Sequence, residues 1–469
     1  MAEPEETLPV PGENLPPPPC RSDWLGQSVH SQVFWLALPV LLEQVFIFFV
    51  GFYNTYLAGH IEGQQSAATA AICMGAYVSW LANLMFMLSS SGALALVARA
   101  KGRNDLEEVN IIAGRAVAIA GMLGLLFAAI TIPFAEYFVR LTKLSPEASQ
   151  IAVRYIRADA CGEIFTALTL AGTAVCRGMG QMKVPLAILM AVSLLNVGFS
   201  TAMVYGIGPF PAMGVDGIVG GTVIARIGGG LLTLAFLFRG FDGLKLRVRE
   251  LRLNGPHVAR MTRIAIPALI DGLIAWSAHF TFVGVISQLG DTAFAAHYIG
   301  VDFEAITYLP ATAWGAAAAT AIGQSLGAGD RERAMRCGHA AALQCLPVGI
   351  IGTLVFGLAG GWVFQVMTSS PQIREVGTSA MGVLACCQIP LVIGIVYIHG
   401  LRGAGETRLP LILAIVSTAG LRVPIAWLFG IAWSGGLAGA WLGMLADVTV
   451  RGVLGAGLYS WARWTKLKI

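Results

Sequence analysis

The stretches CRGMGQMKVP, residues 176–185, and LRGAGETRLP, residues 401–410, are two copies of one pattern, R-G-x-G-x-x-[KR]-x-P. Arg177 corresponds to Arg402, and the copies lie about 225 residues apart, close to half of the 469-residue chain. An internal repeat on this scale decides the architecture. It predicts that the two halves of the chain share one fold.

The repeat extends to other positions. ARAKGRNDLEE places Gly102 where QSLGAGDRERA places Gly327, and Pro39 in LALPVLLEQ corresponds to Pro267 in IAIPALIDG. In the opening motif the glycines allow a tight turn, and the final proline suits the first turn of a helix. We expect its arginine to bind headgroups or to cap helix carbonyls, which makes the motif structural.

The composition indicates a membrane protein. Hydrophobic residues make up 56% of the chain and charged residues only 12%, against about 25% charged in a soluble protein. A net charge of +4 is too small to indicate a nucleic-acid partner. The eight cysteines form no C-x-x-C pair, so neither a disulfide nor a metal site is expected.

Apolar runs near 20 residues long predict about twelve transmembrane helices and no strand. The expected spans are 32–57, 66–97, 108–138, 148–175, 183–205, 213–237, 260–288, 292–323, 333–367, 373–399, 408–430 and 437–461. The fold class is therefore an all-α integral membrane protein with two six-helix bundles. Because six is even, both halves enter the membrane from the same side, as a parallel repeat with a binding site expected between them.

The domain boundaries follow from these spans. Residues 1–30, acidic and Pro-rich, read as a disordered cytosolic tail, and residues 31–237 as the first bundle. Residues 238–259 form a basic cytosolic linker and residues 260–469 the second bundle. Lys and Arg gather in alternate loops, which predicts that both termini are cytoplasmic in a multi-pass protein of the cell (inner) membrane.

The sequence resembles the multidrug and toxic compound extrusion (MATE) transporters over nearly everything after residue 30. The resemblance rests on LPVLLEQVFIFFVGFYNTYLAG, the two R-G-x-G turns, LLNVGFSTAMVYGIGPFPAMGVDG and YLPATAWGAAAATAIGQSLGAGDRERA. It implies export of cationic amphiphilic drugs or metabolites by antiport with Na⁺ or H⁺ through alternating access. The family's usual acids are replaced here at four positions, by Asn54, Ser200, Ala275 and Leu391.

Other ionisable residues inside the predicted helices are the candidates for ion coupling or substrate binding, since such groups usually face a cavity or each other. Glu43 and Asn54 fall on one face of the first helix. Glu43 either exchanges a proton, caps a neighbouring helix or pairs permanently with an arginine. On the fourth helix, Glu163 lies one turn from Asp159. That pair either holds a proton or Na⁺, or forms salt bridges with the nearby Arg154 and Arg157.

The second half supplies further candidates. Asp271 lies four residues after Pro267, where a freed carbonyl and a carboxylate can ligate a cation; the alternative is a hydrogen bond that packs two helices. Asp302 and Glu304 are two residues apart, so at most one of them is expected to face the cavity, and His297 shares a face with Glu304 as a possible proton relay. Asn196, on the fifth helix, ligates substrate or an ion, or joins two helices.

One charged pair and four aromatic side chains complete the set. Arg422 and Asp447 are expected to pair across the last two helices, as a structural contact. Four aromatic side chains either stack on a cationic drug or pack between helices, namely Trp276, Phe280, Tyr308 and Trp314.

The preferred function is therefore a monomeric secondary exporter that needs no cofactor, since the chain has no G-x-x-x-x-G-K-[ST] loop. Its partners would be a small cationic or amphipathic substrate, H⁺ or Na⁺, and membrane lipid. The alternative is a flippase for a lipid or lipid-linked cargo, which is disfavoured because the candidate acids outnumber the basic residues placed inside the membrane. H-E-x-x-H and G-x-S-x-G motifs are absent, so an enzyme is not expected.

Overall fold

The computed structural model describes residues 28–59, 61, 65–140, 146–253, 255–368 and 370–467. The predicted tail over residues 1–30 lies almost wholly outside these described residues. The first six long helices are α1 (Val29–Gly59), α2 (Gln65–Gly102), α3 (Leu106–Arg140), α4 (Pro146–Gly178), α5 (Lys183–Tyr205) and α6 (Val215–Arg239).

The second six segments repeat this order. They are α7 (Gly255–Ser287), α8 (Asp291–Gly327), α9 (Arg331–Met367), α10 (Pro371–Gly403), an interrupted helix over Arg408–Ala432, and α13 (Gly436–Ser460). In the interrupted helix, α11 (Arg408–Ala414) and α12 (Val423–Trp427) are continued by π-helical turns over Ile415–Arg422 and Leu428–Ala432. Ten of the twelve segments are long and apolar enough to cross a membrane, so the chain is a multi-pass membrane protein.

The predicted spans agree with the observed helices to within a few residues, and the turn chemistry explains their ends. In the repeated motif, the second glycine of each copy is left-handed, with φ of +85° at Gly180 and +84° at Gly405. Glycine adopts this conformation without the steric cost that a Cβ brings. The two copies therefore make the same tight turn, between α4 and α5 and between α10 and α11.

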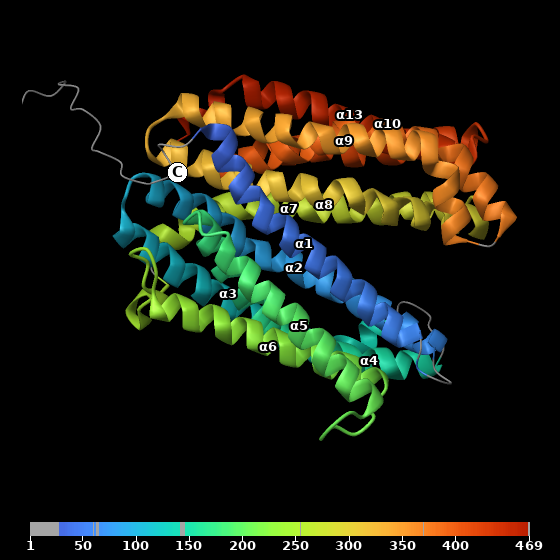
Figure 1. Ribbon diagram of the computed structural model, residues 1–469, viewed down its shortest axis with the longest axis horizontal. Helices are drawn as coiled ribbons and strands as arrows, with labels where there is room; N and C mark the ends of the chain where they lie inside the picture. Colours follow the sequence, from blue (N-terminus) through green and yellow to red (C-terminus); the bar gives the residue numbers. More distant parts are fainter. Residues whose placement is uncertain are drawn as a thin grey trace, which may run out of the picture.

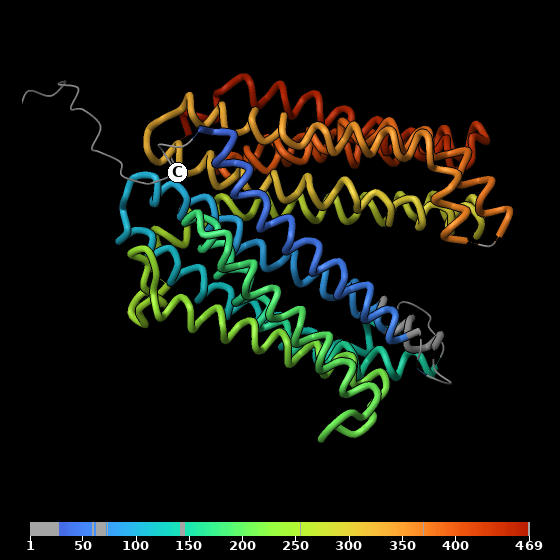
Figure 2. The backbone as a smooth tube through the Cα atoms, viewed as in Figure 1, coloured from blue at the N-terminus to red at the C-terminus, as the bar shows by residue number. Residues whose placement is uncertain are grey.

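The helices form two bundles that are linked by their first helices (Figure 1). α1 packs against α5 of its own half and also along α8 of the other half, and α7 likewise packs against α2 and the interrupted helix. Figure 2 shows α1 running across from one bundle to the other. Each bundle therefore shares one long contact with the first helix of its partner.

The two bundles meet closely at one end and diverge toward the other (Figures 1 and 2). At the joined end, the guanidinium of Arg99 on α2 donates to the carbonyl oxygen of Ala404, at 2.7 Å, across the bundle boundary. Gln324 on α8, the position equivalent to Arg99, donates to the carbonyl of Gly178 at 3.0 Å. The repeat thus makes a similar interbundle contact twice, in opposite directions, with acceptor carbonyls one position apart.

Two equivalent glycines permit this approach. A Cβ on Gly102 would collide with the carbonyl oxygen of Gln324, and a Cβ on Gly327 would collide with that of Arg99. α2 and α8 therefore cross with backbone against backbone, which a larger residue would prevent.

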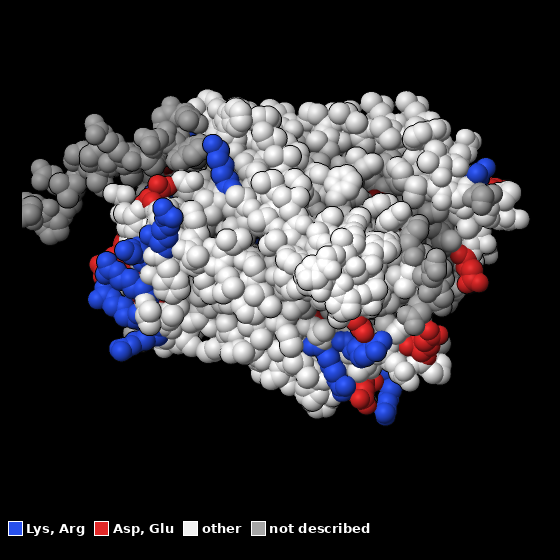
Figure 3. Space-filling view, turned by 60° about the horizontal axis from the view of Figure 1, so that its bottom comes forward, with Lys and Arg blue, Asp and Glu red and all other residues white. Residues whose placement is uncertain are grey.

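Charged side chains gather at the two ends of the molecule, and the face drawn in Figure 3 is uncharged between them. At the open end, the exposed arginines have acidic partners: Arg157 lies 3.0 Å from Glu136, which Arg140 also approaches at 3.8 Å, and Arg154 lies 3.6 Å from Asp216. An uncharged middle of this kind matches the apolar core of a bilayer.

The segment between the bundles, residues 240–253, is ordered against α3. Its main elements are an isolated bridge between Phe241 and Leu244 and a 3₁₀ turn over Val248–Leu251. Arg115 on α3 donates to the carbonyl of Glu250 at 2.6 Å. The linker therefore stays attached to the first bundle.

Candidate functional site

Each half of the chain contains a buried acid–arginine pair. Glu43 lies one turn after Pro39 on α1, is fully buried, and forms an ion pair with Arg177 at the end of α4. The arginine is that of the first R-G-x-G motif. The structural alternative for Glu43, pairing with an arginine, is thus the arrangement observed here.

The second half repeats this pair. Asp271 lies one turn after Pro267 on α7, is 3% exposed, and forms an ion pair with Arg402 of the second motif. The expectation that these arginines bind headgroups or cap carbonyls is wrong in this structure. They reach inward instead, because a buried carboxylate without a partner is far more costly than an arginine withdrawn from water.

A cavity of about 540 Å³ lies within the first bundle and is lined by α1, α2, α4, α5 and α6. We call it the N chamber. Asn54 and Asn196 both line it, and the side-chain oxygen of each is buried without a hydrogen-bond partner among the described residues. The Asn196 amide donates to Thr222 Oγ1 at 2.9 Å, which fixes its orientation. Two carbonyl-type acceptors are therefore available on the chamber wall.

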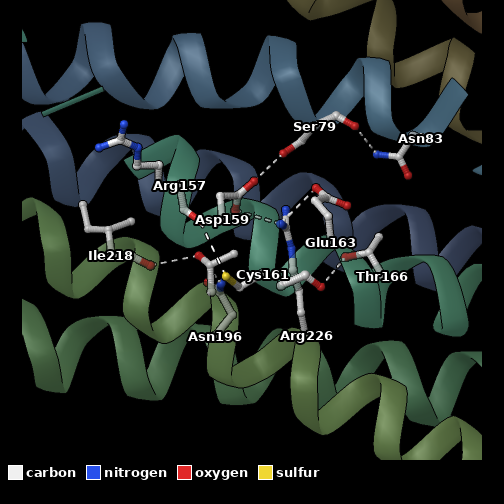
Figure 4. Close-up of polar contacts among 12 residues, drawn as sticks. Ser79, Asn83, Arg157, Asp159, Cys161, Glu163, Thr166, Asn196, Ile218 and Arg226 are labelled. Carbon is white, nitrogen blue, oxygen red and sulfur yellow. Dashed lines mark hydrogen bonds and ion pairs between the residues drawn. The ribbon is translucent and has the colours of Figure 1, made fainter. Parts of the chain in front are cut away.

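Behind the N chamber lies a triad of charges, drawn in Figure 4. Arg226 on α6 lines the chamber and lies 2.7 Å from Asp159 and 3.0 Å from Glu163, both on α4. Ser79 on α2, another lining residue, donates to Asp159 at 2.8 Å. Two carboxylates thus face one guanidinium, and the triad carries an excess of one negative charge when both acids are ionised.

The arginines nearest in sequence are not the partners of these acids. The alternative in which Arg154 and Arg157 pair with Asp159 and Glu163 is wrong, because these arginines pair with Asp216 and Glu136 at the open end. Arg226 was not identified at all. Its signal was present in GGTVIARIGGG, because an arginine inside an apolar helix usually faces a partner or a cavity.

A second cavity, of about 320 Å³, lies within the second bundle. We call it the C chamber. Its polar lining groups come from five elements and are Asp271, Glu304, Tyr308, His399, Arg402, Arg422 and Arg451. Behind it, the fully buried Asp447 lies 2.7 Å from Arg422 and 3.0 Å from Arg451. The expected contact between Arg422 and Asp447 is confirmed, and Arg451 joins it.

Asp302 and Glu304, the candidate acids on α8, point in different directions, as expected for residues two positions apart on a helix. Glu304 lines the C chamber, whereas Asp302 is exposed and is not part of the lining. His297 accepts a hydrogen bond from the Trp441 indole at 3.0 Å, so its Nδ1 is engaged by a tryptophan and not by Glu304. Of the aromatic residues, Tyr308 lines the C chamber, and Trp276 stacks on Phe280 with centroids 5.7 Å apart.

Three of the four positions without the usual family acids line the same two cavities. Asn54 lines the N chamber, and Ala275 and Leu391 line the C chamber. Ser200 instead donates to the carbonyl of Ile218 at 3.3 Å. Asp271 lies one turn from Ala275 and so supplies a carboxylate to the same chamber wall.

The buried charges are closer to balance than the sequence suggests. Four arginines line the two chambers, namely Arg226, Arg402, Arg422 and Arg451, so the buried acids outnumber the buried bases only slightly. A buried carboxylate needs a nearby cation to remain ionised, and arginine supplies it with several donors. The two chambers differ in their net charge. Carboxylates outnumber arginines at the N chamber, whereas the two are equal in number around the C chamber.

Comparison with known proteins agrees with the fold. The chain is 25% identical over 441 residues to a protein of Thermotoga maritima named "Probable multidrug resistance protein NorM", covering 94% of both chains. It is 24% identical to "Multidrug resistance protein PmpM" of Pseudomonas aeruginosa, covering 89% of this chain and 88% of that one. A solved structure described as an outward-facing multidrug resistance MATE family transporter superposes with a TM-score of 0.85 at 19% identity, over 94% of this chain and 96% of that one.

The model of the MatE family matches the chain twice, over residues 39–201 and residues 267–428. These segments begin at Pro39 and Pro267, the two prolines that the internal repeat aligns, and together they cover more than half of the sequence. The chain therefore belongs to the MatE family.

Proposed function

We propose that this protein is a monomeric secondary exporter that expels cationic amphiphilic drugs or metabolites in exchange for H⁺ or Na⁺. The observation that carries the proposal is the N chamber. It combines two unpartnered amide oxygens with an acid-rich triad behind the wall. A cation entering the chamber compensates the excess negative charge of Asp159 and Glu163. The names of the relatives, as multidrug resistance proteins, support the same conclusion.

The membrane orientation forms part of the proposal. The joined end carries the loops that are rich in lysine and arginine, so we place it, with both termini, in the cytosol. The structure then corresponds to an outward-open state in which the halves 31–237 and 260–469 are the moving units. Closure of the open end and separation of the joined end would expose the chambers to the cytosol.

Exchange follows from competition for the same charge. A proton or Na⁺ bound at Asp159 or Glu163 removes the excess negative charge that holds the cationic substrate. Ion and substrate therefore stabilise different states of the chamber, and each shifts the equilibrium only by its differential affinity. Outside the cell, ion binding would release the drug, and the return step would release the ion to the cytosol.

The test is transport by purified protein in liposomes, with a fluorescent cationic dye and with Na⁺ and pH gradients imposed separately. We expect one of the two gradients to drive dye accumulation. Glu163→Gln should abolish most of that gradient dependence, while Glu332→Gln, which changes an exposed acid on α9, should not alter it. The proposal would be refuted if dye transport did not depend on either gradient, or if transport by Glu163→Gln depended on the gradient as strongly as transport by the wild type.

The C chamber favours a second candidate, a flippase for lipid or lipid-linked cargo. Three arginines line that chamber, and guanidinium groups are well suited to bind a phosphate headgroup. Reorientation of a fluorescent anionic lipid in the same liposomes would detect this activity. A flippase should reorient the lipid in the absence of either ion gradient, which an antiporter should not do.

A further inference from the structure

We propose that the C chamber binds the carboxylate of a small, largely apolar organic acid, and that it does so together with a proton on Glu304. This inference does not depend on the proposed drug transport. It rests on the count of charges around the chamber, on the absence of an ion pair to Glu304 among the described residues, and on the size and apolar character of the remaining wall.

The charges around the C chamber do not cancel without Glu304. Arg402 is paired with Asp271, while Arg422 and Arg451 share Asp447. Three guanidinium groups thus face two carboxylates. Arg422 and Arg451 each lie within 3.0 Å of Asp447, so one acid neutralises two bases only in part.

Glu304 is the acid that can complete the balance. It lines the same chamber, makes no ion pair with another described residue, and has a buried Oε1 without a hydrogen-bond partner. When Glu304 is ionised the set of six charges is neutral. When Glu304 carries a proton, one positive charge remains in a confined site, and an anion is the group that removes this cost.

Every element packed around Glu304 enters this count. On α9, the stretch facing it, residues 349–356, is uncharged, and Gly352 lies against Thr307 of α8. The titratable or charged groups that face the chamber or lie next to it are Asp271 and His279 of α7, His297 and Tyr308 of α8, Cys387, His399 and Arg402 of α10, Arg422 of the interrupted helix, and Asp447 and Arg451 of α13.

His399 is the main competing site for the proton. It lines the chamber, and its Nδ1 lies 2.9 Å from the carbonyl of Ile395, which makes that nitrogen a donor. Protonating the other ring nitrogen would place a new cation beside Arg402. A proton on Glu304 raises the net charge of the set by the same amount, but it turns a buried anion into a neutral group and puts no further cation next to a guanidinium, so Glu304 is the more favourable site.

The rest of the wall specifies an organic anion. Leu391, Ile395, Ile398 and Val448 line the chamber next to the arginines. The cavity of about 320 Å³ is far larger than a single inorganic ion needs, because one water occupies about 30 Å³. An organic acid fits both parts of this wall. Its carboxylate would bind the guanidinium groups, and its aromatic or aliphatic body would pack against the apolar side chains.

The two bound species are linked. A proton on Glu304 favours the anion, and by reciprocity the anion favours the proton. Anion binding in the C chamber should therefore strengthen as the pH falls. The N chamber, where Asp159 and Glu163 outnumber Arg226, should show no such preference for anions.

Calorimetric titration of the purified full chain in detergent, in a chloride-free buffer, tests the proposal with benzoate as the probe and benzamide as its neutral counterpart. We expect benzoate to bind at least about tenfold more tightly at about pH 5.5 than at about pH 8, and benzamide to bind weakly at both. Glu304→Gln, which mimics the protonated acid, should bind benzoate equally at both pH values. Asp302→Asn, an exposed acid two residues away, should retain the wild-type pH dependence.

Several results would overturn the proposal. If the wild type binds benzoate equally at both pH values, no proton is bound together with the anion. If the pH dependence survives in Glu304→Gln, the proton binds another group, such as His399. Equal binding of benzamide would show that the site does not require a charge, and displacement of benzoate by millimolar chloride would show that it does not select an organic anion. The wild-type arms decide the matter even if the variant is unstable. None of these outcomes bears on dye transport, so the two proposals fail separately.

Discussion

Glu43 on α1 is buried against Arg177 at the end of α4, and the two side chains form an ion pair. Asp271 and Arg402 form the equivalent pair in the second half. In each half, the first helix is thus held to the arginine of the repeated turn. This matters because α1 and α7 also pack against helices of the opposite bundle. The pairs fix the helices that link the two bundles.

The first prediction concerns stability. Glu43→Leu should lower the free energy of unfolding by about 3–5 kcal/mol, because it leaves Arg177 buried without its counterion. Adding Arg177→Met should restore much of that loss, since an apolar pair needs no compensation. Thermal unfolding in detergent measures both. The exposed pair of Glu332 and Arg336, 3.9 Å apart, is the control, and Glu332→Gln should change stability by at most about 0.5 kcal/mol. A Glu43→Leu protein as stable as the wild type would contradict the assignment.

The second prediction concerns efflux. Glu43→Gln and Asp271→Asn keep the side-chain shape but remove the negative charge of each pair and leave the arginine without a counterion. We expect each variant to export less dye from cells at normal expression, because the first helix of that half no longer forms an ion pair with the arginine of the repeated turn. Full efflux by the protein that carries both substitutions would exclude these acids from ion coupling.

The sequence was sufficient for the fold and only partly sufficient for the site. The repeat and the apolar spans predict twelve helices because burial in lipid imposes length and composition on each helix separately. Ion pairs between helices follow no such local rule. Arg177 lies 134 residues from Glu43, and Arg226 lies 67 residues from Asp159, so spacing along one helix identified neither contact. The π-helical turns around α12 likewise left no clear signal in the sequence.

The third prediction concerns the N chamber. Asn196→Ala removes one of the two unpartnered amide oxygens on the chamber wall and should weaken binding of a cationic dye by about tenfold, as expected for loss of one or two hydrogen bonds to a charged group. Fluorescence titration of the dye on purified protein is the measurement. Asp302→Asn, outside both chambers, should bind the dye as the wild type does. Unchanged binding by Asn196→Ala would show that the dye does not occupy the N chamber.

The fourth prediction concerns the joined end. Gly102→Val places side-chain atoms where the carbonyl of Gln324 lies, so α2 and α8 cannot approach as closely. We expect this variant to lose most efflux and to react faster with a thiol reagent at a cysteine introduced beside the contact. Gly382→Val, on an exposed part of α10 where a Cβ meets no atom within 4 Å, is the matched control and should transport normally. Normal efflux by Gly102→Val would mean that this contact need not close during transport.

The most direct test of the account is a pair of distances measured by double electron–electron resonance in lipid nanodiscs, in a background without native cysteines. One pair of spin labels, at Ala212 and Gln372, reports on the open end, and the other, at Lys245 and Glu332, reports on the joined end. The account predicts that a change of pH or Na⁺, or addition of dye, shortens the first distance and lengthens the second. Distances at both ends that stay the same under every condition would contradict alternating access by these two bundles.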